Sequence, residues 1–151
     1  MKAQVAFEYI LVLGFAFAII VPGAYLFYRH SVGAGDEIVS SRIHKAGIDL
    51  ITTSQEAFAH GEHSWITYST NLPEEIVKIY VLRDYELIIE FNSGGGTSQA
   101  IYFSDVVMNG TICGKNADNN VVCNVSNSFH TGLNKYRVES KGDYVSITEI
   151  V

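Results

Sequence analysis

The sequence predicts an α+β protein in which a long N-terminal helix is packed, along its second half, on a C-terminal antiparallel β-sandwich or curled sheet. Residues 9–28 carry no charged side chain, an amphipathic pattern of helical period follows them, and from Ser64 onward the pattern changes to that of short strands. We expect a membrane-spanning helix over residues 4–30, an amphipathic helix over residues 31–61 and a β domain over residues 62–151.

Charge and composition exclude one broad class of function. Only 17% of the residues are charged, the formal net charge is −6, and the sequence has no cluster of Lys and Arg. Nucleic-acid-binding proteins need a basic surface to neutralise phosphates. We therefore expect no nucleic-acid partner.

The apolar run over residues 9–28 predicts a transmembrane helix. At 1.5 Å per residue, its length of about 30 Å matches one hydrocarbon core. A secretory signal peptide is the alternative, but its apolar region is usually about 7–15 residues long and precedes a small-residue cleavage site. Here Arg29 and His30 follow directly, and residues 33–35 match such a site poorly.

Glu8 places a carboxylate at the edge of this apolar run. On insertion scales a carboxylate costs about 2.5–3.5 kcal/mol at the centre of a membrane helix and less near the interface. Glu8 is therefore either an interfacial acid favoured by the dipole at a helix N-terminus or a residue with a role of its own.

The stretch KAQVAFEYIL, residues 2–11, resembles the class III signal peptide of archaeal type IV pilins. The resemblance implies that a prepilin peptidase cuts between Ala3 and Gln4 on the cytoplasmic side, and so removes residues 1–3 as a leader. Glu8 then becomes the fifth residue of the mature chain. The sequence departs from the family pattern at Ala3, where Gly is common, and at Ala6, where Ser is common.

The resemblance also implies a function: a structural subunit, major or minor, of a surface filament that mediates adhesion. Its partners would be copies of itself, the peptidase and the assembly machinery. The precursor would cross the cell membrane once with a short cytoplasmic N-terminus, and the mature protein would lie in a cell-surface filament. A secretion pseudopilus stays open as a filament of the same type.

Three residues would serve assembly on this interpretation: Gln4, Glu8 and Pro22. The Glu8 carboxylate would meet the new α-ammonium group of Gln4 in a neighbouring subunit, because an unpaired charge in an apolar bundle is costly. Pro22 removes one helix hydrogen bond. It is either a loosening that helps subunits pack or an ordinary kink of a membrane helix.

Helical period continues after Gly33-Ala34-Gly35, where we expect the helix to be interrupted. At about 100° per residue, one arc of about 140° collects the apolar residues, and the opposite arc is polar. The apolar set is Val39, Ile43, Ala46, Gly47, Leu50, Ile51, Ala57 and Phe58. The polar set is Arg42, His44, Lys45, Asp49, Gln55 and Glu56. Ile38 and Ile48 fall outside the apolar arc.

The remaining chain reads as about seven short strands separated by polar turns. Six of them can be placed, at residues 65–68, 76–82, 86–91, 100–103, 136–139 and 144–148. Arg83-Asp84-Tyr85 and Lys141-Gly142-Asp143 predict hairpin turns, and the glycine-rich residues 92–98 predict a loop.

Cys113 and Cys123 stand ten residues apart in a segment that reads as loop. A disulfide between them would close about 11 residues and contribute roughly 2.8 kcal/mol in the chain-entropy model, and it would require an oxidising compartment. Free thiols are the alternative.

Asn109 and Asn124 each begin an N-glycosylation sequon, Asn-Gly-Thr and Asn-Val-Ser.

Nothing in the sequence indicates catalysis, a cofactor or a metal. His60, Glu62 and His63 cluster after the amphipathic helix, but such clusters are usually solvated loop residues, and no nucleophile or phosphate-loop spacing occurs. We expect no enzymatic activity.

The alternative to a filament subunit is a monomeric, membrane-anchored extracellular binding protein. The residues from Gln4 to Glu8 favour the filament, because a mere anchor needs neither a cleavage site nor a carboxylate.

Overall fold

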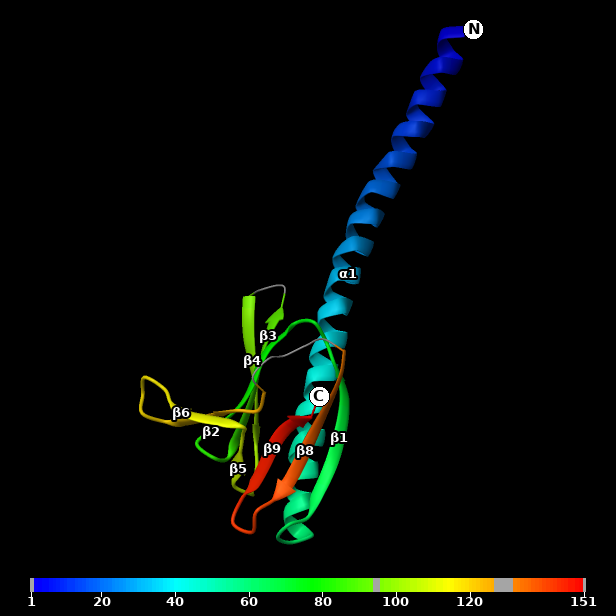
Figure 1. The fold of residues 1–151 in the computed structure, drawn as a ribbon. Coiled ribbons are helices and arrows are strands. Elements are labelled where there is room, and N and C mark those ends of the chain that lie inside the picture. Colours follow the sequence, from blue (N-terminus) through cyan, green and yellow to red (C-terminus); the bar gives the residue numbers. More distant parts are fainter. Residues whose placement is uncertain (1, 94–95, 127–131, 151) are drawn as a thin grey trace. The chain divides into compact units, whose positions relative to one another are not determined.

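The computed structural model describes residues 2–93, 96–126 and 132–150, and their side chains except those of residues 2–6, 32–34 and 36. This part of the chain contains one helix and nine strands (Figure 1). The chain divides into two compact units, residues 1–38 and residues 39–151. The second unit joins the C-terminal part of the helix to all the strands.

The helix α1 (Lys2–Ala59) keeps helical backbone over its whole length and contains Pro22. The predicted interruption at residues 33–35 is therefore wrong. A glycine inside a helix costs about 1 kcal/mol relative to alanine, which is too little to end a helix that residues on both sides propagate cooperatively.

The strands form two sheets. Their bounds are β1 (Trp65–Leu72), β2 (Ile76–Leu82), β3 (Glu86–Ser93), β4 (Gly96–Phe103), β5 (Met108–Asn109), β6 (Ile112–Lys115), β7 (Val121–Asn124), β8 (Gly132–Ser140) and β9 (Val145–Ile150). Sheet A has the order β1-β8-β9-β5, and sheet B has the order β4-β3-β2-β7-β6. All pairs are antiparallel except the two-residue pair of β5 with β9. The α+β fold predicted from the sequence is confirmed at this level.

Both predicted hairpins are present. β2 pairs with β3 through a turn in which Arg83 and Asp84 adopt left-handed backbone angles, with φ of 53° and 67°. β8 pairs with β9 across Lys141-Gly142-Asp143. The loop expected over residues 92–98 is largely strand, because β3 runs to Ser93 and β4 begins at Gly96; residues 94–95 lie outside the described part. These strand ends were predicted as a loop because their residues are polar or glycine.

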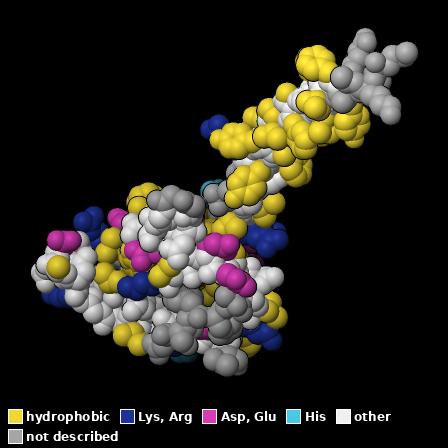
Figure 2. Space-filling view, turned by 90° about the horizontal axis from the view of Figure 1, so that it is seen from above, with side chains coloured by type: hydrophobic (Ala, Val, Ile, Leu, Met, Phe, Trp, Pro, Cys, Tyr) yellow, Lys and Arg dark blue, Asp and Glu magenta, His cyan; other side chains and the backbone are white. Residues whose placement is uncertain are grey.

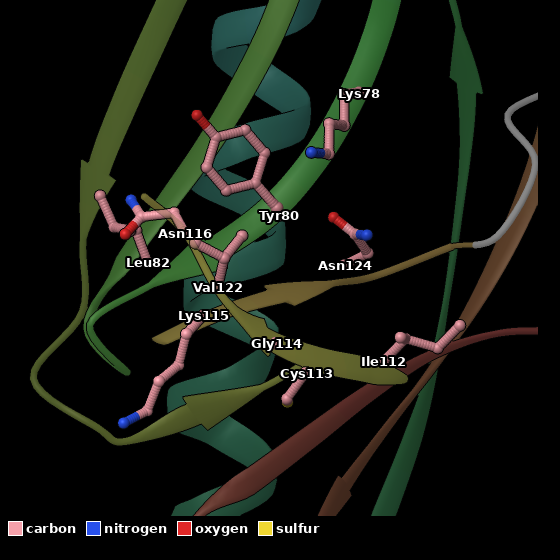
Figure 3. Close-up of a pocket in the computed structure, with 10 residues that line it drawn as sticks. All are labelled: Lys78, Tyr80, Leu82, Ile112, Cys113, Gly114, Lys115, Asn116, Val122 and Asn124. Carbon is pink, nitrogen blue, oxygen red and sulfur yellow. The ribbon is translucent and has the colours of Figure 1, made fainter. Parts of the chain in front are cut away.

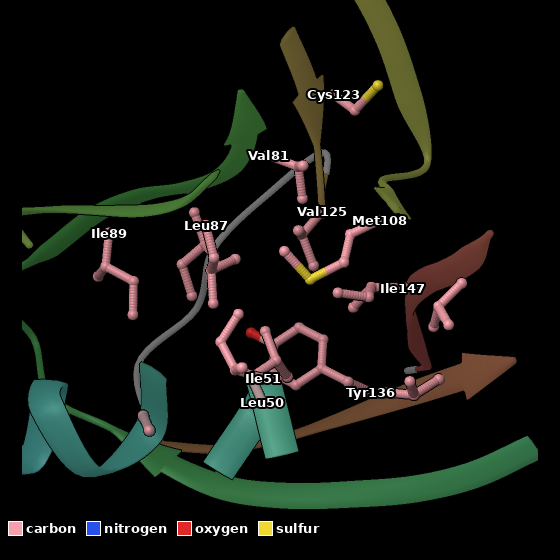
Figure 4. Packing of buried hydrophobic residues seen from close by; sticks show 14 of the residues in the cluster. Leu50, Ile51, Val81, Leu87, Ile89, Met108, Cys123, Val125, Tyr136 and Ile147 are labelled. Atoms are coloured by element: carbon pink, nitrogen blue, oxygen red, sulfur yellow. The ribbon is translucent and has the colours of Figure 1, made fainter. Parts of the chain in front are cut away.

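One hydrophobic core fills the second unit. Helix α1 and the inner faces of both sheets contribute to it, and Figure 4 shows Leu50 and Ile51 of the helix facing Leu87 of β3 and Tyr136 of β8. Residues of β8 and β9 alternate between this core and the outer surface, whereas β3 buries three consecutive residues, Leu87–Ile89. The core therefore depends on contacts between segments far apart in the sequence.

The apolar arc predicted for the helix is the buried one. Its buried members are Ile43, Ala46, Gly47, Leu50, Ile51 and Ala57. Val39 is half-buried, whereas Phe58, near the helix end, is exposed. Ile38 and Ile48 are exposed, as their positions outside the arc indicate.

Tyr136 is the largest fully buried side chain of the core, with 1% of its surface exposed. Its hydroxyl has no hydrogen-bond partner in the described part of the chain. Burial raises the pKa of Tyr136 well above its usual range, and the nearby negative charge of Glu149 raises it further. The folded protein therefore strongly disfavours the tyrosinate form.

This burial predicts a loss of stability in alkali. Because the folded pKa is raised, the stabilisation is complete below the unfolded pKa of about 10 and is lost as pH rises above it, by about 1.4 kcal/mol at pH 11. Tyr136→Phe should abolish this part of the pH dependence. It should also raise the free energy of unfolding by about 1 kcal/mol at pH 7, because a buried unpaired hydroxyl costs about 1–3 kcal/mol.

Urea unfolding of the full chain in detergent micelles, followed by the fluorescence of Trp65, measures both effects. The control is Tyr85→Phe, which removes the hydroxyl of a tyrosine that is 48% exposed in the β2–β3 turn. A Tyr136→Phe variant that loses as much stability as wild type between pH 7 and pH 11 would contradict the burial argument.

Candidate functional site

The first unit contains an apolar helical segment that the rest of the chain does not bury. Residues Phe7–Ser31 are long and apolar enough to cross a membrane, and none of this segment is buried within the chain. Figure 2 shows hydrophobic side chains covering most of the visible face of this part of the helix. Tyr25 and Tyr28 are also exposed there. A core helix of a soluble domain is buried by its own chain, so this segment needs lipid or other protein chains as its surroundings.

Glu8 lies near the beginning of this apolar segment and is exposed. Pro22 lies inside it. Ala3 and Gln4 have helical backbone, but their side chains lie outside the described residues. Cleavage between Ala3 and Gln4, and the pairing of Gln4 with Glu8, therefore stay predictions.

The segment that reads as loop around the two cysteines is a hairpin of β6 and β7. Cys113 and Cys123 lie directly opposite each other in its register and form the predicted disulfide, with a Cα–Cα distance of 4.0 Å. The turn between the strands is held by Asn116, whose Oδ1 accepts hydrogen bonds from the backbone N–H groups of Asp118 and Asn120 at 3.1 and 2.9 Å. The turn and the disulfide together fix this short hairpin.

A groove of about 420 Å³ lies between the outer face of β2 and this hairpin (Figure 3). We call it the hairpin groove. Its lining residues are Lys78, Tyr80, Leu82, Ile112, Cys113, Gly114, Lys115, Asn116, Val122 and Asn124. The Lys78 ammonium lies 4.9 Å from the centre of the Tyr80 ring, and the Tyr80 hydroxyl donates to Glu90 Oε1 at 3.5 Å. The groove combines an aromatic ring, apolar surface, two amides and two cations.

Sequence reasoning missed the groove, although one signal for it was present. The alternation along β2 places Ile79 and Val81 in the core and turns Lys78, Tyr80 and Leu82 outward. The sequence did not indicate which distant strand pairs with β2. β2 pairs with β7, about 40 residues farther along the chain, through Tyr80 opposite Asn124 and Leu82 opposite Val122.

The two sequons have different surroundings. Asn109 ends β5, and its Oδ1 lies 3.1 Å from Cys113 Sγ and 2.8 Å from Cys123 Sγ. Asn124 lines the hairpin groove, and its Oδ1 is buried with no hydrogen-bond partner in the described part of the chain. Asn124 thus adjoins the hairpin groove, and Asn109 is not among the residues that line it. Glycosylation at either residue stays a prediction.

The histidine cluster after the helix is spread over the surface. His60 Nε2 lies 3.9 Å from Glu56 Oε1, and His63 Nδ1 lies 3.9 Å from Glu62 Oε1. All four side chains are exposed. Within residues 2–93, 96–126 and 132–150, no three His, Cys, Asp or Glu side chains come together in a way that suits a metal ion.

Comparison with known proteins gave no match: no protein-family model, curated protein or solved structure is similar to this chain.

Proposed function

We propose that this chain is a pilin-like structural subunit, major or minor, of an archaeal type IV pilus-like surface filament that mediates adhesion. The observation that carries the proposal is the uncovered apolar segment Phe7–Ser31, with Glu8 near its start. In the precursor the lipid bilayer surrounds this segment. In the filament the same segments of neighbouring subunits surround it.

Processing prepares the segment for this change of surroundings. Cleavage between Ala3 and Gln4 removes the positive charge of Lys2 and creates an α-ammonium group on Gln4. Residues 4–8 then carry one positive and one negative group at the edge of an otherwise apolar helix. In a bundle of such helices, each Glu8 carboxylate is neutralised by the ammonium group of a neighbour. The pair acts as a register device, because a wrong stagger leaves both charges unpaired.

The second unit is the part displayed outside the cell. Its disulfide between Cys113 and Cys123 suits an oxidising environment, in which such bonds form and persist. This agrees with an N-terminus that stays on the cytoplasmic side. The hydrophobic core of the second unit needs no lipid, so this unit is suited to a water-exposed position at the surface of a filament.

N-terminal sequencing of protein from native membranes and from sheared surface fibres tests the proposal. The fibre protein should begin at Gln4. A control variant, Ala3→Asp, places a charged residue where the family pattern has a small one. It should accumulate as uncut precursor and be absent from fibres.

A different result would favour a monomeric membrane-anchored binding protein. In that case the mature chain begins at Met1, stays in the membrane fraction and is absent from fibres. The hairpin groove would then be its first candidate ligand site.

A further inference from the structure

The hairpin groove has its own covalent attachment point, because Asn124 of the sequon Asn124-Val125-Ser126 lines it. We propose that the groove holds an acidic glycan that is N-linked to Asn124 of the same chain. This inference rests on the proposed export of the second unit to the cell surface, where glycosylated proteins occur.

The groove suits a ligand that is recognised by side chains. The backbone of β2 is already paired with β3 and β7, and that of β7 with β2 and β6. An extended peptide laid over β2 and β7 would therefore find no free backbone partners in these two strands, unlike a peptide added to a sheet edge such as β6. A pyranose ring has apolar C–H faces and hydroxyl groups around its rim. The apolar surface of Leu82, Val122 and Ile112 can cover a face, and the amide of Asn116 is among the polar groups that line the groove.

The charges in the groove favour an acidic sugar. None of the ten lining residues is Asp or Glu, and two of them are lysines, in a chain with a formal net charge of −6. The nearby acid is Glu90, which accepts from the Tyr80 hydroxyl and lies opposite Lys78 in the pairing of β2 with β3. Figure 3 shows Lys78 and Lys115 at opposite ends of the group of lining residues. A carboxylate or sulfate on the glycan would form charge-assisted hydrogen bonds with either ammonium group.

Attachment at Asn124 positions the glycan without a separate binding step. Asn124 lies in β7 opposite Tyr80 of β2 on one side and Ile112 of β6 on the other, so its backbone is fixed within the sheet. A linkage to Nδ2 holds the first sugar beside the groove at a high effective concentration.

The position of Ser126 sets the time of attachment. Ser126 is buried and its hydroxyl donates to the Glu149 carboxylate. A modifying enzyme can reach the complete sequon only before the sheet closes. The glycan is therefore added to the unfolded, exported chain.

Mass spectrometry of peptides from the native protein is the first test. Asn124 should carry a glycan that contains at least one uronic acid or sulfated sugar. An unmodified Asn124, or a wholly neutral glycan there, overturns the inference. Either result leaves the pilin proposal intact, because that depends on the N-terminus and on filament assembly.

The second test asks whether the glycan lies in the groove. Melting temperatures are compared for full chains produced in the native host and in a host without N-glycosylation. The glycan should raise the melting temperature by about 4 °C, which for this size corresponds to about 1 kcal/mol. Lys78→Gln should remove at least half of that gain.

The matched control is Lys135→Gln, which makes the same charge change on an exposed residue of β8 in the other sheet. It should leave the gain from the glycan unchanged. Equal losses in the two variants, or no loss in Lys78→Gln, would place the glycan outside the groove and overturn the inference.

Discussion

Replacing Glu8 with alanine is expected to reduce the yield of assembled filaments at least tenfold. The variant leaves the α-ammonium group of Gln4 without a counter-charge among apolar helices. Removing one partner of a buried ion pair typically costs about 3–5 kcal/mol, and each 1.4 kcal/mol is a factor of ten in association. Electron microscopy and quantification of sheared fibres measure the yield.

Two controls separate assembly from earlier steps. Glu37→Ala removes an exposed acid of α1 outside the apolar segment, and its fibres should form normally. The N-terminal sequence of Glu8→Ala protein in the membrane shows whether cleavage before Gln4 still occurs. Normal fibre yield from Glu8→Ala would end the proposed role of Glu8 in subunit registration.

Local patterns predicted those parts of the fold that depend on local contacts. Short apolar runs between turn residues identified β2, β3, β8 and β9, and helical period identified the buried face of α1. These signals are strong because one face of each element is buried and the other is solvated. The disulfide was predictable because its two cysteines are only ten residues apart in the sequence.

Contacts between distant segments were not predictable. β1 pairs with β8 over eight residues, from Trp65 opposite Glu139 to Leu72 opposite Gly132, and no local pattern encodes that choice. The short strands β5, β6 and β7 were missed because Asn, Gly and Asp dominate their surroundings and read as turn. The hairpin groove is formed by the outer face of β2 together with the hairpin of β6 and β7. It could therefore not be predicted from the sequence.

Gly110 must be a glycine because its segment packs closely against β7. A Cβ atom at Gly110 would lie 2.7 Å from the carbonyl oxygen of Cys123 and still closer to that of Asn124. Beside it, the backbone N–H of Thr111 donates to Asn124 O at 2.8 Å, and Thr111 Oγ1 donates to Val125 O at 3.0 Å. The glycine is thus required by close approach to the main chain of β7.

Gly110→Ala is expected to lower the free energy of unfolding by about 3 kcal/mol, at the upper end of the usual cost of overpacking. The atoms it would strike are backbone atoms of β7, and β7 is paired with β2 and β6 on its two sides. β7 cannot move away from the new methyl group without weakening its backbone hydrogen bonds to β2 or β6. Urea unfolding of the full chain in micelles, followed by the fluorescence of Trp65, measures the change.

Gly114→Ala is the matched control, because it adds the same methyl group four residues farther along the chain, in β6. A Cβ atom there has no heavy atom within 4 Å, so its free energy of unfolding should stay within about 0.5 kcal/mol of wild type. The alanine at 110 also keeps the Asn109 sequon, which separates packing from glycosylation. If both variants unfold at the wild-type urea concentration, the segment from Met108 to Thr111 does not pack against β7 as described. The hairpin would then lack the support that holds Asn124 beside the groove.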